Sequence, residues 1–293
     1  MPPAGDNLLF KHIGANTVAK ILIIGCGDIG YRLALQLHQH GHQLTGLKRQ
    51  APLTSAAFPI FLADIRQMAT LDALPVDFDA VIFIVSPDGR QAEAYQALYE
   101  LGLNNLLAHF AKGGTAPSWL MVSSTSVYGQ NNGEWVDESS PTEPDSATSQ
   151  WLVKAEQRLW AAGDRHCVVR FAGIYGPGRN WLIRRAAQAE RIQHQPPSYT
   201  NRIHQDDCVA VLLFLLEKQL GGDKLQACYL ACDNDPAPLW DVMVWIAKQY
   251  GYPPPQALDT PAEAPQNKRC SNARLMALGY RLLYPSYQDG YRA

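Results

Sequence analysis

Three glycines stand at the spacing G-x-G-x-x-G between an apolar run and an amphipathic segment. Gly25, Gly27 and Gly30 follow the run 21–24. At such a place the first glycine permits a tight turn, the second lets the backbone approach a pyrophosphate, and the third lets the helix pack closely. The helix start at Asp28 and Ile29 adds open N–H groups and a positive dipole end. This predicts a dinucleotide site, with a turn that binds nothing as the alternative.

Two cations, Lys48 and Arg49, follow the second expected strand, 43–47. An acid about 20 residues past the glycines holds the ribose hydroxyls of NAD, whereas cations there attract the 2′-phosphate of NADP. We therefore expect NADP(H) to be preferred over NAD(H). The alternative is a solvated loop with two ordinary surface cations.

Two further strand ends are expected to reach the same cofactor. Asp64 and Ile65 follow the strand 59–63, and Asp64 either faces the adenine or caps a helix at 66–71. The apolar run 80–85 ends at Val85, and Ser86 follows it. Ligands of open α/β sheets bind beyond such carboxyl ends.

Strands and helices alternate along the chain in a way that predicts its fold class. Crossovers long enough for helices indicate parallel strands with right-handed connections. We expect an α/β, Rossmann-type, doubly wound parallel sheet of about seven strands with a smaller C-terminal substrate lobe. The expected parts are an N-terminal extension (1–17), an NAD(P)-binding domain (18–173) and the substrate lobe (174–293), with roughly 203–232 returning to the main sheet.

Four later segments carry a family resemblance. They are SSTSVYG at 123–129, VRFAGIYGPG at 169–178, IHQDD at 203–207 and SNARLMALGY at 271–280. In this order they resemble the extended short-chain dehydrogenases/reductases, the NAD-dependent epimerase/dehydratase family. The resemblance implies an NAD(P)-binding enzyme that acts on a nucleotide-sugar or a related carbonyl or hydroxyl metabolite. It also implies that Ser124 hydrogen-bonds the reacting oxygen.

The family's catalytic pair, a tyrosine four residues before a lysine, is absent from this sequence. One alignment places Thr148 at the tyrosine position and Leu152 at the lysine position. The other takes Lys154 as the lysine and places Gln150 at the tyrosine position. The acid could then be Tyr128, Tyr175, His204 or a water held by Ser124 and Thr148. The family also usually opens with G-x-x-G-x-x-G, and the glycine loop here is one residue shorter. In its missing tyrosine and its short loop the sequence resembles the branch called YeeZ-like. A non-catalytic NADP-binding sensor is the second hypothesis, and an ordinary dehydrogenase with a helical second domain ranks last.

Several residues of the second lobe are expected to meet the substrate. Arg179, Asn180 and Arg202 lie where, by the resemblance, that lobe contacts its ligand, and the planar fork of arginine suits a diphosphate. Tyr175 and His204 are placed beside them. Asp207 is expected to cap its helix.

The composition limits which binding partners and which cellular compartment we expect. The 293 residues carry a net charge of −2, which gives no reason to expect nucleic acid or an anionic membrane as a partner. Six cysteines without a C-x-x-C pair predict buried thiols in a reducing compartment. We expect a cytoplasmic protein with a small-molecule substrate and no metal; a homodimer stays open.

Overall fold

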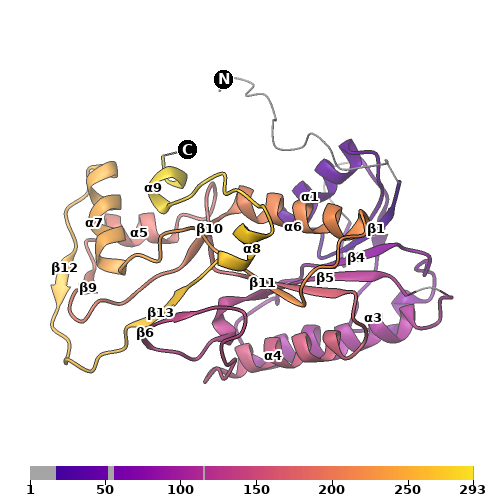
Figure 1. Ribbon diagram of the computed structural model, residues 1–293, viewed down its shortest axis with the longest axis horizontal. Coiled ribbons are helices and arrows are strands. Elements are labelled where there is room, and N and C mark those ends of the chain that lie inside the picture. Colours follow the sequence, from indigo (N-terminus) through magenta and orange to yellow (C-terminus); the bar gives the residue numbers. More distant parts are fainter. Residues whose placement is uncertain (1–17, 52–55, 115, 293) are drawn as a thin grey trace.

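A seven-stranded parallel sheet runs through the middle of the molecule (Figure 1). The computed structural model describes residues 18–51, 56–114 and 116–292, so the expected extension 1–17 lies outside the described residues. The strand order is β11-β7-β5-β4-β1-β2-β3. The strands are β1 (Lys20–Ile24), β2 (Gln43–Lys48), β3 (Ile60–Leu62), β4 (Ala80–Phe83), β5 (Ser118–Ser124), β7 (His166–Phe171) and β11 (Cys228–Ala231). This arrangement confirms the doubly wound fold class.

The topology places a crevice at the carboxyl end of β1. The chain begins in the middle of the sheet, moves outward through β2 to β3, and then restarts on the other side at β4. In register, Ile24 of β1 lies between Leu47 of β2 and Phe83 of β4. The loops after β2 and β4 leave the sheet in different directions, and ligands bind where the strand order reverses in this way.

Helices cover both faces of the sheet (Figure 1). One face carries α1 (Asp28–Gln39) and α6 (Gln205–Leu220), and the other carries α2 (Ala92–Gln96), α3 (Leu103–Phe110) and α4 (Ala147–Trp160). A π-helical stretch, Ala97–Gly102, joins α2 to α3, so the chain is helical from Ala92 to Phe110. The helix expected at 66–71 is instead a single 3-10 turn, Met68–Leu71.

Each face of the sheet buries its own apolar core because alternate strand residues point to opposite sides. Leu22 of β1 and Trp119 of β5 belong to the first core, together with Leu159 of α4. Ile23 and Leu120 belong to the second core, under α1 and α6. Strands β1 from Ile21 onward, β4 and β7 are buried, as expected of parallel strands covered on both faces.

The second lobe is built from short paired strands and helices. The pairs are β8 (Gly173–Tyr175) with β10 (Arg202–His204), β9 (Arg191–Gln193) with β12 (Gln256–Leu258), and β6 (Asn132–Val136) with β13 (Asn267–Cys270). The helices are α5 (Trp181–Ala187), α7 (Leu239–Tyr250), α8 (Ala273–Ala277) and α9 (Tyr287–Gly290). A small separate core, including Leu182, Met243 and Ile246, holds α5 and α7 together. Segment 203–232 contributes α6 and β11 to the main domain.

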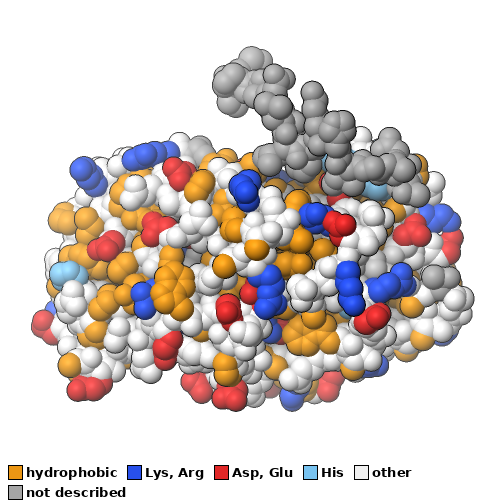
Figure 2. All heavy atoms as spheres, in the orientation of Figure 1, with side chains coloured by type: hydrophobic (Ala, Val, Ile, Leu, Met, Phe, Trp, Pro, Cys, Tyr) orange, Lys and Arg blue, Asp and Glu red, His pale blue; other side chains and the backbone are white. Residues whose placement is uncertain are grey.

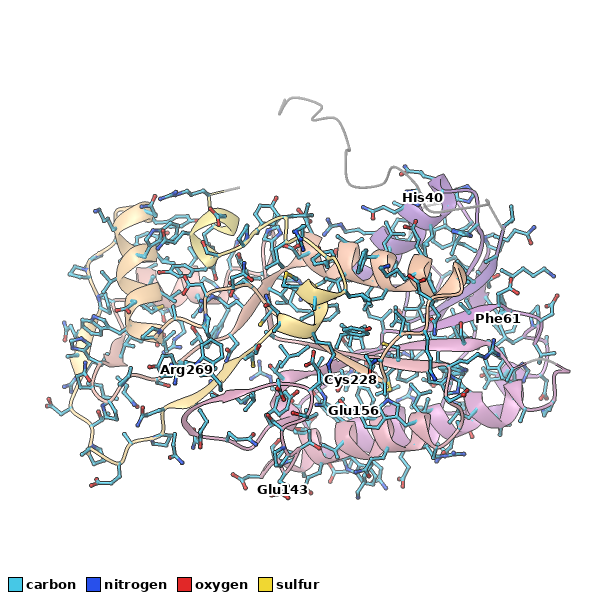
Figure 3. All side chains as sticks on the ribbon, viewed as in Figure 1. His40, Phe61, Glu143, Glu156, Cys228 and Arg269 are labelled. Atoms are coloured by element: carbon cyan, nitrogen blue, oxygen red, sulfur yellow. The ribbon has the colours of Figure 1, made fainter. Side chains whose placement is uncertain are left out.

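A buried ion pair ties α4 to the sheet. Arg170 of β7 donates two hydrogen bonds to Glu156, at 3.0 and 2.6 Å, and a third to the Tyr128 hydroxyl at 2.8 Å. Glu156 lies between α4 and the sheet (Figure 3). Because Glu156 and Arg170 are both buried, each compensates the charge of the other in the interior.

The surface carries both signs of charge. On the face shown in Figure 2, acidic and basic side chains alternate, and no large patch of one sign appears. All six cysteines are free and buried, which confirms the prediction of buried thiols. Within the described ranges, no helix combines the length and the apolar character needed to cross a membrane.

Candidate functional site

A cleft of about 880 Å³ opens at the carboxyl ends of β1, β2 and β4, where the topology places the crevice. Its walls come from the glycine turn, the ends of three strands and one loop of the second lobe. The lining includes Gly25, Gly27, Asp28, Ile29, Gly30, Lys48, Arg49, Ile65, Arg66, Val85, Ser86, Asp88 and Arg179. Most residues predicted to bind a cofactor therefore share one cleft.

The glycine turn has the geometry that a phosphate cradle needs. Gly25 adopts φ +86°, and a Cβ there would lie 2.0 Å from the carbonyl oxygen of Ile84. At Gly30 a Cβ would lie 2.7 Å from the Gly25 oxygen, so this glycine allows α1 to begin close to its strand. Gly27 lines the cleft, and a Cβ there would meet no other group closer than 4.0 Å. The open space at Gly27 lets a ligand approach the backbone, so the turn fits a dinucleotide.

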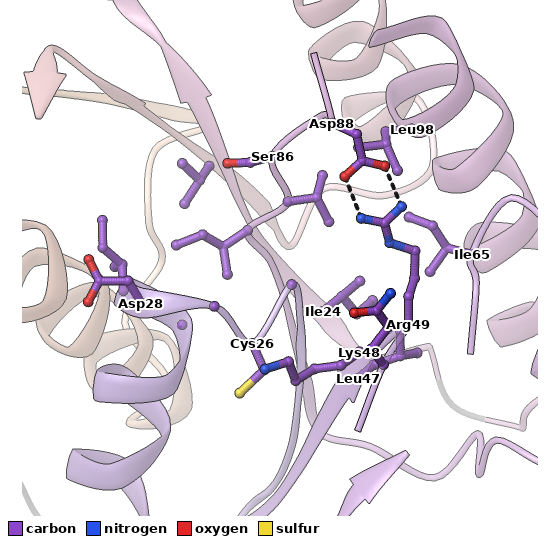
Figure 4. Close-up of a pocket in the computed structure, with 18 of the residues that line it drawn as sticks. Ile24, Cys26, Asp28, Leu47, Lys48, Arg49, Ile65, Ser86, Asp88 and Leu98 are labelled. Atoms are coloured by element: carbon purple, nitrogen blue, oxygen red, sulfur yellow. Dashed lines mark hydrogen bonds and ion pairs between the residues drawn. The ribbon is translucent and has the colours of Figure 1, made fainter. Parts of the chain in front are cut away.

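Three cations line one end of the cleft. Lys48 and Arg49 were predicted from the sequence, and Arg66, which follows β3, joins them. Arg49 forms a two-pronged ion pair with Asp88, which lies after β4 (Figure 4). The hydrogen bond from Arg49 holds the pKa of Asp88 below its ordinary value. Sequence reasoning missed Arg66, although a cation directly after a strand end was the available signal.

Asp64 has a different place from the one expected. It is not part of the cleft lining; its carboxylate accepts hydrogen bonds from the Nε of Arg66 at 2.8 and 3.1 Å and from the Arg66 backbone N–H at 3.0 Å. These bonds lower the pKa of Asp64. Asp64 thus orients Arg66, whereas its neighbour Ile65 lines the cleft itself.

A contact between the two lobes crosses the cleft beside the glycine turn. Arg179, in the loop after β8, donates a hydrogen bond of 3.1 Å to the carboxylate of Asp28. Arg179 was predicted to contact substrate, and it lines the same cleft as the glycine turn. Its neighbour Asn180 is exposed at the start of α5 and is not part of the lining.

Ser124 stands at the end of β5, two residues beyond Val122, which lines the cleft. The two side chains point to the same face because strand residues alternate. The Ser124 Oγ accepts a hydrogen bond of 3.1 Å from the Ser126 N–H, so its own proton stays available for a ligand. Ser124 itself is not among the residues that line the cleft, but its side chain points to the same face of β5 as that of Val122, which does line it.

Hydroxyl groups occupy the start of α4, where the tyrosine and lysine are missing. Ser146 caps the helix, and its Oγ lies 2.8 Å from that of Ser149 and 3.3 Å from that of Thr148. Ser149 donates to Ser126 Oγ at 2.9 Å. Thr148 is thereby linked through hydroxyls to the turn that holds Ser124.

Tyr128 was a wrong candidate for the proton donor. Its side chain is buried in the core beside α4, and its hydroxyl accepts the hydrogen bond from Arg170. Burial raises the pKa of this hydroxyl above its ordinary value. A group that is enclosed and bonded in this way supports the fold and does not reach the cleft.

Three of the predicted substrate contacts are also buried, under the C-terminal segment 280–292. Tyr175 donates to the carbonyl of Ser286 at 3.3 Å. The His204 ring lies 3.9 Å from that of Tyr284, and Arg202 stacks on Tyr287 at 4.7 Å. The structure therefore contradicts the expectation that Tyr175, Arg202 and His204 face a ligand.

The capping role expected of Asp207 belongs instead to His204. The His204 Nδ1 accepts the backbone N–H of Asp206 at 3.2 Å. Asp207 is fully buried and accepts from the Tyr280 hydroxyl at 2.7 Å and from the Leu283 N–H at 2.8 Å. Asp207 thus anchors the C-terminal segment to α6.

Comparison with known proteins assigns this fold and cleft to a family. Residues 21–227 match the model of the NAD dependent epimerase/dehydratase family. The chain belongs to this family. It is 28% identical to Protein YeeZ of Escherichia coli K12 over 282 residues, which cover 91% of this chain and 96% of the relative.

Solved structures agree with this membership. A candidate NAD-dependent epimerase/dehydratase from Methylobacillus flagellatus is 35% identical, with a TM-score of 0.79 over 94% of this chain and 97% of that one. The fold is also that of Thermus thermophilus UDP-glucose 4-epimerase in complex with NAD, at 18% identity and a TM-score of 0.74 over 93% and 96% of the two chains. In the part of this family member that is described, no three histidine, cysteine or acidic side chains gather as metal ligands would.

Proposed function

We propose that this chain is an NADP(H)-preferring oxidoreductase or epimerase/dehydratase that acts on a nucleotide-sugar or a related carbonyl or hydroxyl metabolite. The observation that carries the proposal is the cleft itself, in which a tight glycine turn and three cations face one space. Family membership supports dinucleotide binding, and the cations support the preference for a 2′-phosphate.

Different residues of this chain would bind different parts of the dinucleotide. The backbone at Gly27 and the start of α1 would receive the pyrophosphate, because the open N–H groups and helix dipole favour anions. Lys48, Arg49 and Arg66 would receive the 2′-phosphate. Val85 and Ser86, beyond β4, form part of the wall between the two ends. When bound, the nicotinamide supplies the redox chemistry.

Ser124 would orient the reacting oxygen of the substrate. Its hydroxyl already accepts from Ser126 and is free to donate to that oxygen. A water held by Ser124 and the hydroxyls of Thr148 and Ser146 is our candidate for the proton source, since a tyrosine is missing and Tyr128 is enclosed. Neutral hydroxyls are weaker acids than a tyrosine assisted by lysine, so we expect slow turnover.

The first turns of α4 also favour a second function. Leu152, which one alignment places at the lysine position, is buried, and the amino group of Lys154, which the other places there, lies over the Trp151 ring at 4.0 Å. A chain that keeps the cofactor cleft without an acid–base pair suits a sensor that binds NADP(H) and responds by conformational change.

Titration of the cofactor-stripped protein with NADPH and NADH, followed by nicotinamide fluorescence, tests the proposal. We expect tighter binding of NADPH, and failure to bind either nucleotide would refute both functions. Turnover with a panel of nucleotide-sugars and simple carbonyls then separates enzyme from sensor. Ser124→Ala should lower turnover without weakening NADPH binding, whereas Ser139→Ala, at an exposed serine outside the cleft, should change neither.

A further inference from the structure

The ion pair between Arg49 and Asp88 has a consequence for how the cleft selects its ligand. We propose that Asp88 is a specificity-determining residue, an internal competitor that holds Arg49 until a 2′-phosphate displaces it. The inference rests on the proposed binding of NADP(H) and deepens it. The chemical class of ligand is an adenosine nucleotide that carries a 2′-phosphate.

The geometry supports competition for Arg49. Arg49 follows β2 and Asp88 follows β4, which are the two neighbours of β1, so the pair spans the crevice at the end of β1. Figure 4 shows the two prongs of the pair crossing the cleft. The Arg49 Nη2 lies 2.5 Å from Asp88 Oδ1, and Nη1 binds Oδ2. Asp88 thus occupies the fork that a phosphate would take.

The other two cations at this end do not share this restraint. Arg66 is held by Asp64, two residues away in the chain and outside the lining, so its carboxylate does not cross the cleft. Lys48 makes no ion pair within the described ranges. Asp88 is therefore the carboxylate that faces these cations from the opposite wall.

The energies allow an exchange of partners. The side chains of Arg49 and Asp88 are 44% and 60% exposed, and an exposed pair of this kind contributes about 1 kcal/mol or less. A 2′-phosphate offers Arg49 the same paired oxygens with a larger negative charge. The uncharged 2′-hydroxyl of NADH offers no such replacement, so with NADH the ion pair stays closed.

The experiment compares Asp88→Asn with the wild-type protein in titrations with NADPH, NADH and adenosine 2′,5′-bisphosphate. Freeing Arg49 should tighten the binding of NADPH and of the bisphosphate about three- to fivefold and change that of NADH less than about twofold. Asp77→Asn is the matched control. It removes the same charge from an exposed ion pair with Lys20, at the opposite end of β1, and should alter none of the three affinities.

A double-mutant cycle with Arg49→Met separates competition from simple repulsion. If Asp88 acts by holding Arg49, Asp88→Asn should have little effect once Arg49 is absent. An equal effect in both backgrounds would overturn the inference, as would weaker NADH binding by Asp88→Asn, because Asp88 would then itself hold the ribose. Wild-type protein that binds NADPH with no gain from Asp88→Asn refutes this inference alone, whereas wild-type protein that binds neither nucleotide refutes the proposed function as well.

Discussion

Replacing Gly27 by alanine adds one methyl group where the glycine turn faces the cleft. In the folded protein Gly27 has φ −85° and ψ −148°, and its Cβ would come no closer than 4.0 Å to another group. We therefore expect the free energy of unfolding to change by no more than about 1 kcal/mol. Gly25→Ala is the contrast, because φ is +86° and the Cβ would lie 2.0 Å from a backbone oxygen; about 3 kcal/mol or more should be lost.

Although Gly27→Ala should hardly change stability, we expect it to weaken dinucleotide binding. The second glycine of such a turn lets the backbone approach the pyrophosphate, so the methyl group of Gly27→Ala would push the phosphates outward. We expect a loss of at least about tenfold, or about 1.4 kcal/mol, and equally for NADPH and NADH because both contain the pyrophosphate. Fluorescence titration measures the affinities, and thermal unfolding confirms that the variant is folded.

A matched variant makes this result interpretable. Gly114→Ala, in the loop before β5 and so at the opposite edge of the sheet, also meets no atom within 4 Å and should leave both affinities unchanged. Unaltered stability together with unaltered nucleotide affinity in Gly27→Ala would refute the assignment of the turn to the pyrophosphate.

Two further predictions concern buried charge. Glu156→Gln should destabilise the protein by about 3–5 kcal/mol in denaturant unfolding, because Arg170 would remain buried without its counter-charge; a change below 1 kcal/mol would contradict this account. Burial raises the pKa of Asp233 to about 7 from an ordinary 3.8, so the folded state binds this proton more tightly and stability should fall as the pH rises from 4 to 7. Over the range between these two pKa values, the loss of stability is on the order of 4 kcal/mol. Asp233→Asn should flatten this pH dependence. An identical pH dependence of unfolding in both proteins would show that Asp233 is not its source.

The parts of the fold that sequence patterns predicted well are those decided locally. The glycine turn and its flanking strand and helix lie where the spacing placed them, and Gly251 ends α7 in the left-handed conformation that favours glycine. The pairing of β6 with β13 was missed because its strands lie more than 130 residues apart in the chain. Such short strands carry no periodic signal and are defined only by their partner.

The candidate site was predictable where strand ends determine position and unpredictable where side-chain direction matters. Lys48 is the last residue of a strand that ends at the crevice, Arg49 follows it, and both line the cleft. Tyr128, after the end of β5, and Tyr175, at the end of the short strand β8, belong to similar motif segments, yet both side chains are buried. The loop sequence places their backbone but does not reveal that Arg170 and the C-terminal segment bind their hydroxyls.

The start of α4 shows what kind of chemistry the site retains. Its hydroxyls can hold a water and position an oxygen through Ser124. At the lysine position, however, one alignment has the buried Leu152, and the other has Lys154, whose amino group lies over the Trp151 ring. A developing negative charge on substrate would therefore rely on hydrogen bonds and on the dipole of α4 alone. The positive charge of the cleft is concentrated instead at the end predicted to bind the 2′-phosphate. This distribution favours tight, selective cofactor binding over fast proton transfer, which is the property shared by a slow reductase and a sensor.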